Sequence, residues 1–165
     1  MTVVVVMGVS GSGKTTVGTA LASALGVPYA EADTFHPEAN IAKMTSGRPL
    51  TDDDRWPWLR SIAGWIAAHQ DIGGVVTSSA LKRSYRDVLR TGGDLWFLHL
   101  DGDRRLLAER IKTRSGHFMP ASLLDSQLAD LEPLDPDERG LVADIAEAPE
   151  DIVRTALAAM PTEGA

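Results

Sequence analysis

The chain has 165 residues, the usual size of a single domain with one hydrophobic core. It is 44% hydrophobic and 24% charged, and 16 basic against 23 acidic side chains give a net charge of −7. This acidic balance disfavours a general nucleic-acid binder or an electrostatic membrane binder, and the lack of cysteine excludes disulfides and thiolate metal sites. No apolar run approaches the roughly 20 residues that span a bilayer, and no signal peptide opens the chain, so we expect a cytoplasmic protein.

Apolar β-branched runs alternate with segments of helical period, which predicts an α/β domain with a parallel sheet. Strands are expected at 3–7, about 27–31, 73–78, 94–100 and near 141–146. Helices are expected after the first loop as far as residue 25, and then at about 37–46, 55–69, 82–91, 103–114, 120–130 and 149–160. The last residues, 161–165, are expected to fray.

The segment between the first strand and the first helix matches the pattern G-x-x-x-x-G-K-[ST]. It reads Gly8-Val9-Ser10-Gly11-Ser12-Gly13-Lys14-Thr15 and is followed by Thr16. Glycines let successive backbone N–H groups approach phosphate oxygens, and the helix that begins here adds the positive end of its dipole. Lys14 can serve the β- and γ-phosphates, and the Thr15 hydroxyl can bind Mg²⁺. The segment predicts a nucleoside triphosphate site, but it leaves open whether water, a protein, a nucleotide or a metabolite accepts the phosphoryl group.

Two carboxylates follow at the end of the second predicted strand. Period-two alternation places Glu31 and Asp33 on one side of the strand end, where parallel α/β sheets bind their ligands. Asp33 could accept the proton of an attacking hydroxyl, and Glu31 could hold Mg²⁺ through water. Alternatively, both are surface acids that cap the next helix. His36 precedes Pro37, a residue that suits the first position of a helix.

The stretch from Gly47 to Leu59 combines acidic and aromatic residues. Asp52, Asp53 and Asp54 suit the N-terminal turn of a helix, where negative charge is favourable. The two tryptophans of this stretch, at 56 and 58, suit a core position.

Basic residues recur on a later predicted helix. Lys82, Arg86 and Arg90 stand at fourfold spacing and form one stripe, which in an acidic protein suggests an anionic ligand. The alternative is a solvated helix face, on which Arg83 and Asp87 form an i,i+4 ion pair.

Two further arginines, Arg110 and Arg114, lie one helical turn apart and precede a short segment from Ser115 to Pro120. Arginines beside a flexible segment suit a lid that closes over phosphates and excludes water. The alternative is a plain helix end with favourable C-terminal cations.

Together these stretches resemble the gluconokinases of the P-loop kinase superfamily. The resemblance covers residues 3 to about 134 and rests on GVSGSGKTT (8–16), ADTFHPEANIAKMTSGRPLTDDDRWPWL (32–59), SALKRSYRDVLR (79–90) and RSGHFMPASLLDSQLADLEPL (114–134). It implies a three-layer P-loop kinase fold in one domain, residues 1–165, with a short lid at about 114–120. It also implies phosphorylation of D-gluconate at its 6-hydroxyl by ATP with Mg²⁺, in an enzyme that is commonly a homodimer.

The resemblance carries over to individual residues. Asp33 matches the acidic base, Thr15 the magnesium hydroxyl, and Arg110 and Arg114 the lid arginines. Glu31 stands where the family usually has Asp. The gluconate pocket is expected to contain Asp33, His36, Arg55, Lys82 and His117. We expect adenine to meet backbone near Glu147 to Pro149, with Arg110 stacked on the base.

Two other functions compete with this interpretation. One is a kinase for another small hydroxy acid, such as shikimate. The other is a nucleotide-binding NTPase or switch without a small-molecule acceptor. No nucleic-acid or membrane partner is expected in any of the three cases.

Overall fold

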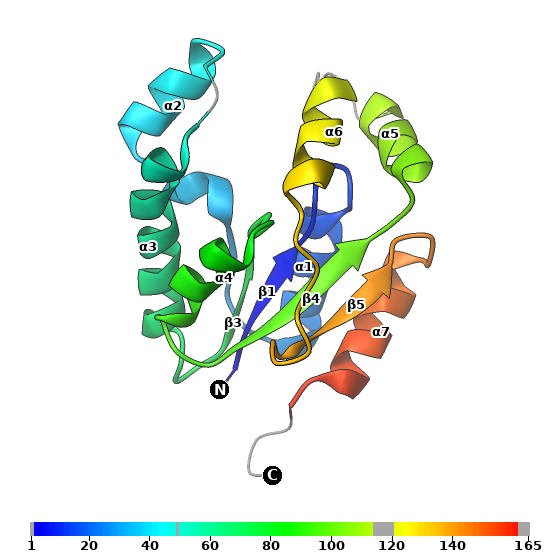
Figure 1. Cartoon of the computed structure of the whole chain (residues 1–165). Coiled ribbons are helices and arrows are strands. Elements are labelled where there is room, and N and C mark those ends of the chain that lie inside the picture. The colour runs from blue at the N-terminus through cyan, green and yellow to red at the C-terminus, as the bar shows by residue number, and fades with distance from the viewer. Residues whose placement is uncertain (1, 49, 114–120, 162–165) are drawn as a thin grey trace.

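A computed structural model describes residues 2–48, 50–113 and 121–161 of the chain. Five strands form one sheet in the order β2-β3-β1-β4-β5, and each neighbouring pair is parallel (Figure 1). The strands are β1 (Val3–Met7), β2 (Tyr29–Glu31), β3 (Gly74–Thr77), β4 (Leu95–Asp101) and β5 (Gly140–Asp144). The predicted parallel α/β sheet is confirmed.

Helices cover both faces of this sheet. The helical segments are α1 (Lys14–Leu25), the 3₁₀ turn η1 (Ala32–Phe35), α2 (Glu38–Thr45), α3 (Asp52–Ala68), α4 (Arg83–Arg90), α5 (Arg104–Thr113), α6 (Ala121–Asp130) and α7 (Pro149–Ala159). Side chains of β1 alternate between two cores: Val5 packs with Leu59 of α3, and Val4 packs with Leu21 of α1. The three-layer architecture follows from this alternation.

Helix α3 begins three residues earlier than the hydrophobic pattern predicts, because Thr51 and Asp54 cap it reciprocally. Thr51 Oγ1 accepts a hydrogen bond from the Asp54 N–H at 3.2 Å, and Asp54 Oδ2 accepts one from the Thr51 N–H at 2.8 Å. Lys43 of α2 contacts the same Oδ2 atom at 2.6 Å. The capping role considered for the acidic stretch is therefore correct for Asp54.

Strand β2 is shorter than predicted and ends at Glu31. Asp33 lies in the 3₁₀ turn η1, so the strand alternation that grouped the two carboxylates does not extend to it.

The loops after β1, β2 and β3 emerge at one edge of the sheet. Figure 1 shows α2 on one side of this edge and α5 with α6 on the other. Among the described residues no helix is both long and apolar enough to cross a membrane. The predicted lid at 114–120, with Arg114 and His117, lies outside the described residues, as do residues 162–165 of the tail.

Candidate active site

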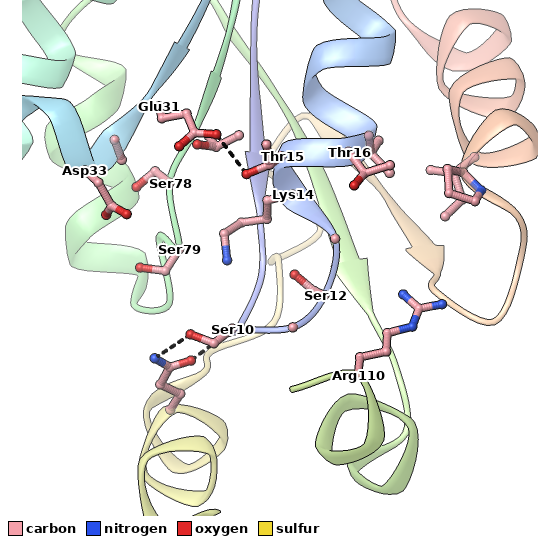
Figure 2. Close-up of a pocket in the computed structure, with 18 of the residues that line it drawn as sticks. Ser10, Ser12, Lys14, Thr15, Thr16, Glu31, Asp33, Ser78, Ser79 and Arg110 are labelled. Carbon is pink, nitrogen blue, oxygen red and sulfur yellow. Dashed lines mark hydrogen bonds between the residues drawn. The ribbon is translucent and has the colours of Figure 1, made fainter. Parts of the chain in front are cut away.

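An open pocket of about 800 Å³ lies at the carboxyl edge of the sheet (Figure 2). Its wall is formed by residues 10–17, 31–33 and 77–79, together with single side chains from α3, α5 and α6. Ligands of open parallel sheets bind at this edge. Glu31 and Asp33 both line the pocket, as predicted, although Asp33 reaches it from the 3₁₀ turn η1 and not by strand alternation.

The loop of residues 8–16, called the phosphate loop below, depends on its glycines. Gly13 is the N-cap of α1 and has φ 93° and ψ 25°, a left-handed conformation that disfavours side chains. At Gly8 a Cβ atom would lie 2.7 Å from the carbonyl oxygen of Leu100. The Lys14 ammonium lies against the loop, where Nζ donates to the carbonyl oxygens of Gly8 at 2.8 Å and Val9 at 3.2 Å. The loop thus has the backbone form and the cation that a polyphosphate site requires.

Beside the loop, the carboxylate of Glu31 accepts two hydrogen bonds on one oxygen. Thr15 Oγ1 donates to Glu31 Oε1 at 2.8 Å, and the Tyr29 hydroxyl donates to the same oxygen at 3.0 Å. Burial and the contact with Glu31 raise the pKa of Tyr29 to about 12, so its hydroxyl stays a donor. The described residues contain no group of three or more metal-ligating side chains. Hydroxyl and carboxylate oxygens suit Mg²⁺, which commonly takes few protein ligands and completes its shell with phosphates and water.

Asp33 lies across the pocket from the phosphate loop. Figure 2 shows it near the hydroxyl groups of Ser78 and Ser79, which follow β3. Ser78 Oγ is buried and has no hydrogen-bond partner among the described residues. These groups make the wall opposite Lys14 polar, as a hydroxyl-bearing ligand would require.

The ring of His36 stacks on Trp58, with 4.2 Å between ring centroids and 14° between planes. The indole N–H of Trp58 donates to the carbonyl oxygen of Ala32 at 2.7 Å, which fixes the indole under the pocket. Burial lowers the pKa of His36, and the positive charge of Arg55 lowers it further, while Asp33 opposes both. Trp58 is therefore a core residue, as predicted, and also part of the pocket wall.

Four side chains beyond His36 form a group that we call the Asp52 cluster: Asp52, Arg55, Lys82 and Tyr85. Neither His36 nor this cluster lines the pocket itself; they adjoin it behind Trp58. The Tyr85 hydroxyl donates to Asp52 Oδ1 at 2.5 Å, and Arg55 Nη1 lies 3.4 Å from the same atom. Lys82 Nζ lies 3.8 Å from Asp52 Oδ2. Burial and the contact with Asp52 raise the pKa of Tyr85 to about 12, and the Tyr85 hydrogen bond lowers the pKa of Asp52. Two cations around one carboxylate leave a net positive charge, which suits an anionic ligand.

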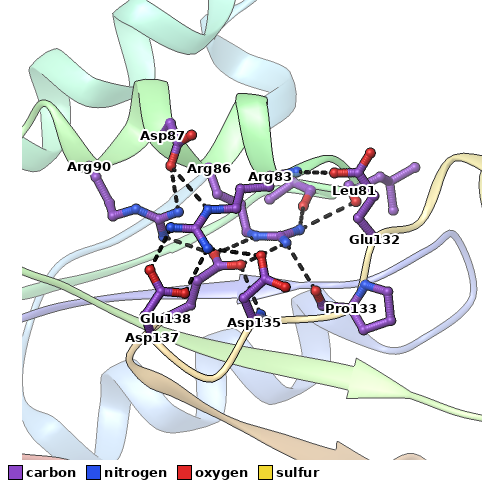
Figure 3. A network of polar contacts seen from close by, with 11 residues as sticks. Leu81, Arg83, Arg86, Asp87, Arg90, Glu132, Pro133, Asp135, Asp137 and Glu138 are labelled. Carbon is purple, nitrogen blue, oxygen red and sulfur yellow. Dashed lines mark hydrogen bonds and ion pairs between the residues drawn. The ribbon is translucent and has the colours of Figure 1, made fainter.

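The sequence suggested that a basic stripe of Lys82, Arg86 and Arg90 binds an anionic ligand. This prediction is wrong for Arg86 and Arg90. Arg86 is buried and pairs with buried Glu138 at 2.7 Å, and Arg90 Nη1 binds the same carboxylate at 2.9 Å (Figure 3). Burial raises the pKa of Glu138, but hydrogen bonds from Arg86, the Asp135 N–H and Arg90 outweigh it and lower the value to about 2. The spacing of Arg86 and Arg90 was correct, but both bind an internal carboxylate from the segment before β5, whereas Lys82 lies beside Asp52.

This buried ion pair supports the loop that leads to Lys82. Arg86 Nη1 donates to the carbonyl oxygens of Ala80 at 2.9 Å and Leu81 at 3.3 Å, and Ala80 has a φ of 45°. The predicted pair of Arg83 with Asp87 is present at 3.6 Å, although Arg83 also binds Asp135 and Asp137.

At the opposite end of the pocket lies Arg110 of α5. Its Nη2 atom donates to the carbonyl oxygen of Ile145 at 2.5 Å, and its Nη1 atom would lie 3.8 Å from a Cβ atom on Gly13. Glu147 and Pro149 line the same end. The segments expected to contact adenine therefore border the phosphate loop.

Three residues of this region were not predicted from the sequence: Asp52 as a neighbour of the pocket, Tyr85, and Gln127 of α6. Gln127 lines the pocket and forms two hydrogen bonds with Ser10 of the phosphate loop. A helical repeat from Lys82 to Tyr85 places these two residues on one face, but no local signal identifies Gln127.

Comparison with known proteins assigns the chain to a family. A family model described as shikimate kinase matches residues 10–132. A gluconokinase of Gluconobacter oxydans is 56% identical over 135 residues, which are 78% of this chain and 74% of the relative. The crystal structure of a gluconokinase from Sinorhizobium meliloti 1021 superposes with a TM-score of 0.87 at 52% identity, covering 96% of this chain and 90% of that one. An unliganded sugar kinase from Janibacter sp. HTCC2649 gives a TM-score of 0.88 at 55% identity over 96% of this chain and 94% of its own. The chain therefore belongs to the gluconokinase family of P-loop kinases.

Proposed function

We propose that this protein transfers the γ-phosphoryl group of ATP to the 6-hydroxyl of D-gluconate, giving 6-phospho-D-gluconate and ADP. The observation that carries the proposal is one pocket that holds the phosphate loop on one wall and Asp33 on the other. Membership of a family whose relatives are named gluconokinase supports this acceptor.

The donor end of the pocket is proposed to hold the triphosphate. Backbone N–H groups of residues 11–15 surround the phosphates, and Lys14 moves from the Gly8 and Val9 carbonyls to the β- and γ-phosphates. Thr15 is proposed as the protein ligand of Mg²⁺, with Glu31 held beside it to receive a magnesium-bound water. When bound, Mg²⁺ neutralises charge on the phosphate oxygens. Arg110 is proposed to stack on adenine next to Glu147 and Pro149.

The acceptor reaction needs little from the protein beyond orientation and proton removal. The 6-hydroxyl oxygen of gluconate forms a bond to the γ-phosphorus as the bond to the β–γ bridging oxygen breaks. ADP leaves with that bridging oxygen, and the hydroxyl proton passes to the carboxylate of Asp33. Because the transition state is loose, Asp33 mainly orients the hydroxyl and takes its proton late.

The remaining polar residues of the acceptor end suit the body of gluconate. This ligand has one carboxylate and a row of hydroxyls, so it needs one or two cations and several hydrogen-bonding groups. Arg55 and Lys82 of the Asp52 cluster are proposed to bind the carboxylate, and His36 a hydroxyl. The lowered pKa of His36 supports a neutral ring that can both donate and accept.

A kinase for shikimate is the second candidate, because the matching family model carries that description. Relatives above 50% identity favour gluconate instead. The homodimer stays a prediction from the family resemblance, and the cytoplasmic location stays a prediction from the sequence pattern.

An acceptor panel tests the proposal. ADP release from MgATP is followed in a coupled assay with gluconate, with shikimate, with glucose and with no acceptor. We expect release to depend on gluconate. Equal ADP release with and without gluconate indicates an NTPase, and release that depends on shikimate alone indicates the second candidate.

A further inference from the structure

One side chain outside the motif contacts the phosphate loop directly. Gln127, on α6, accepts a hydrogen bond from the Ser10 backbone N–H at 2.8 Å through Oε1, and its Nε2 atom donates to Ser10 Oγ at 3.2 Å. The two residues are 117 positions apart in the chain. A reciprocal pair of this kind fixes both the distance and the orientation of the side-chain amide relative to the loop.

Ser10 belongs to the end of the loop that faces the acceptor. Lys14 Nζ, the group for the β- and γ-phosphates, contacts the carbonyl oxygens of Gly8 and Val9, which immediately precede Ser10. Figure 2 shows Ser10 on the same side of Lys14 as Ser79, whereas Arg110 lies on the other side. A γ-phosphate therefore extends towards Ser10, while the adenosine part of the nucleotide extends towards Arg110.

Helix α6 also connects this end of the loop to the acceptor wall. Glu132, two residues after the end of α6, donates its N–H to the Leu81 carbonyl oxygen at 2.7 Å. Its side chain accepts from the Arg83 N–H at 2.9 Å. One short segment of chain thus contacts both the phosphate loop and the loop that carries Lys82.

We propose that Gln127 is a positioning residue for the γ-phosphate and makes the site favour ATP over ADP. This inference rests on the proposed use of ATP as phosphoryl donor. The amide fixes the position of Ser10 relative to α6. One hydrogen of Nε2 is used in the bond to Ser10 Oγ, and this bond orients the second hydrogen for donation to the γ-phosphate. A neutral amide next to the γ-phosphate adds an uncharged hydrogen-bond donor. It therefore strengthens the binding of ATP, which has a γ-phosphate, and does not affect the binding of ADP, which lacks one.

Gln127→Glu is the most specific test, because it keeps the size and the acceptor for the Ser10 N–H but adds a negative charge. Binding of a non-hydrolysable ATP analogue and of ADP, both with Mg²⁺, is measured by calorimetry. We expect the analogue to bind at least about tenfold more weakly, since like charges then lie side by side. ADP affinity should stay within about threefold of the parent, so the ratio of the two affinities falls.

Two further variants separate positioning from stability. Gln127→Ala removes both hydrogen bonds and should weaken the analogue by about three- to tenfold, again more than ADP. Ser126→Glu, an exposed neighbour on the same helix, adds the same charge outside the pocket and should leave both affinities unchanged. Thermal unfolding of each variant reports any general loss of stability.

Equal weakening of the analogue and ADP in Gln127→Glu and Gln127→Ala would overturn the proposal, because it indicates a structural role. So would unchanged analogue binding in both variants. These binding measurements need no acceptor. A parent protein that does not phosphorylate gluconate but shows the expected change in affinity ratio would refute the proposed function alone.

Discussion

The donor end and the acceptor end of the pocket are assembled differently. Nine consecutive residues, 8–16, form the phosphate loop of the donor end, and the backbone geometry of this one segment places its binding groups. The acceptor end takes Asp33 from η1, Trp58 from α3 and the serines after β3. His36 and the Asp52 cluster adjoin this end and are held by contacts between distant segments. The form of the phosphate loop therefore follows mainly from its own glycines, whereas the acceptor end depends throughout on tertiary packing.

The largest effect is expected where the two ends meet, at Asp33. Asp33→Asn keeps the size and can still orient a hydroxyl, but it cannot accept the proton. We expect kcat to fall by about 10²–10⁴, the usual range for loss of a general base, while gluconate still binds. Steady-state kinetics and calorimetry with gluconate measure the two quantities separately.

Glu31→Gln is the matched control for this change, since Glu31 contacts Thr15 rather than the acceptor wall. It should lower kcat less and raise the Mg²⁺ concentration needed for half-maximal activity. A nearly normal kcat in Asp33→Asn beside an inactive Glu31→Gln would mean that the two carboxylates have exchanged roles.

The buried ion pair behind the acceptor end provides the next largest effect. Glu138→Ala leaves the buried Arg86 without its carboxylate, and loss of one partner of a buried pair costs about 3–5 kcal/mol of unfolding free energy. Urea unfolding measures this loss. Arg154→Ala, which breaks the exposed pair with Asp151, is the control and should change the midpoint little.

The same pair gives the stability a pH dependence of known sign. The pKa of Glu138 falls from 4.5 to about 2 on folding, so its contribution is present above pH 4.5 and is lost as the pH falls towards 2. The Glu138→Ala variant should lack this part of the acid transition. An unchanged acid transition in the variant would show that Glu138 is not the titrating group.

At the donor end, Lys14→Ala removes the charge that we propose follows the phosphoryl group through the transition state. Loss of one such electrostatic contact costs on the order of 3–4 kcal/mol, which is about 10²–10³ in kcat. The unfolding temperature should stay close to that of the parent, because the loop depends on Gly8 and Gly13 for its form. A normal kcat would place the γ-phosphate away from Lys14.

The smallest effects are expected when one tyrosine hydroxyl is removed at each end, because each change should alter a different kinetic constant. Tyr85→Phe removes the hydroxyl that binds Asp52, and it should raise the KM for gluconate by about three- to tenfold with little change in kcat. Tyr29→Phe removes the hydroxyl that binds Glu31, and it should change the Mg²⁺ dependence instead. If both variants change the same kinetic constant, the two ends are not independent.

Features that are set within one segment could be predicted from the sequence, whereas features that depend on contacts between distant segments could not. The strands and most helices follow from hydrophobic periodicity, and the phosphate loop follows from glycines at fixed spacing within one segment. Because Thr51 caps α3, the helix begins earlier than its hydrophobic pattern predicts. A 3₁₀ turn starts directly after Glu31, where strand alternation had been extended to Asp33. Both differences are local turn chemistry that competes with periodicity.

The residues that were missed or misassigned depend on contacts between distant segments. Tyr85 binds Asp52 across 33 positions, Arg86 binds Glu138 across 52, and Ser10 binds Gln127 across 117. Helical spacing correctly placed Arg86 and Arg90 on one helix, with Lys82 as its N-cap. It could not show that Glu138, from the segment before β5, would neutralise Arg86 and Arg90.

The fate of the labelled phosphoryl group tests most directly whether the two ends work as one site. In a single turnover, excess enzyme with MgATP labelled at the γ-phosphate is mixed with D-gluconate, and the products are separated. We expect the label in 6-phospho-D-gluconate, with one ADP formed per label transferred and little inorganic phosphate. Label that appears in inorganic phosphate at the same rate with and without gluconate would contradict transfer between the two ends of the pocket.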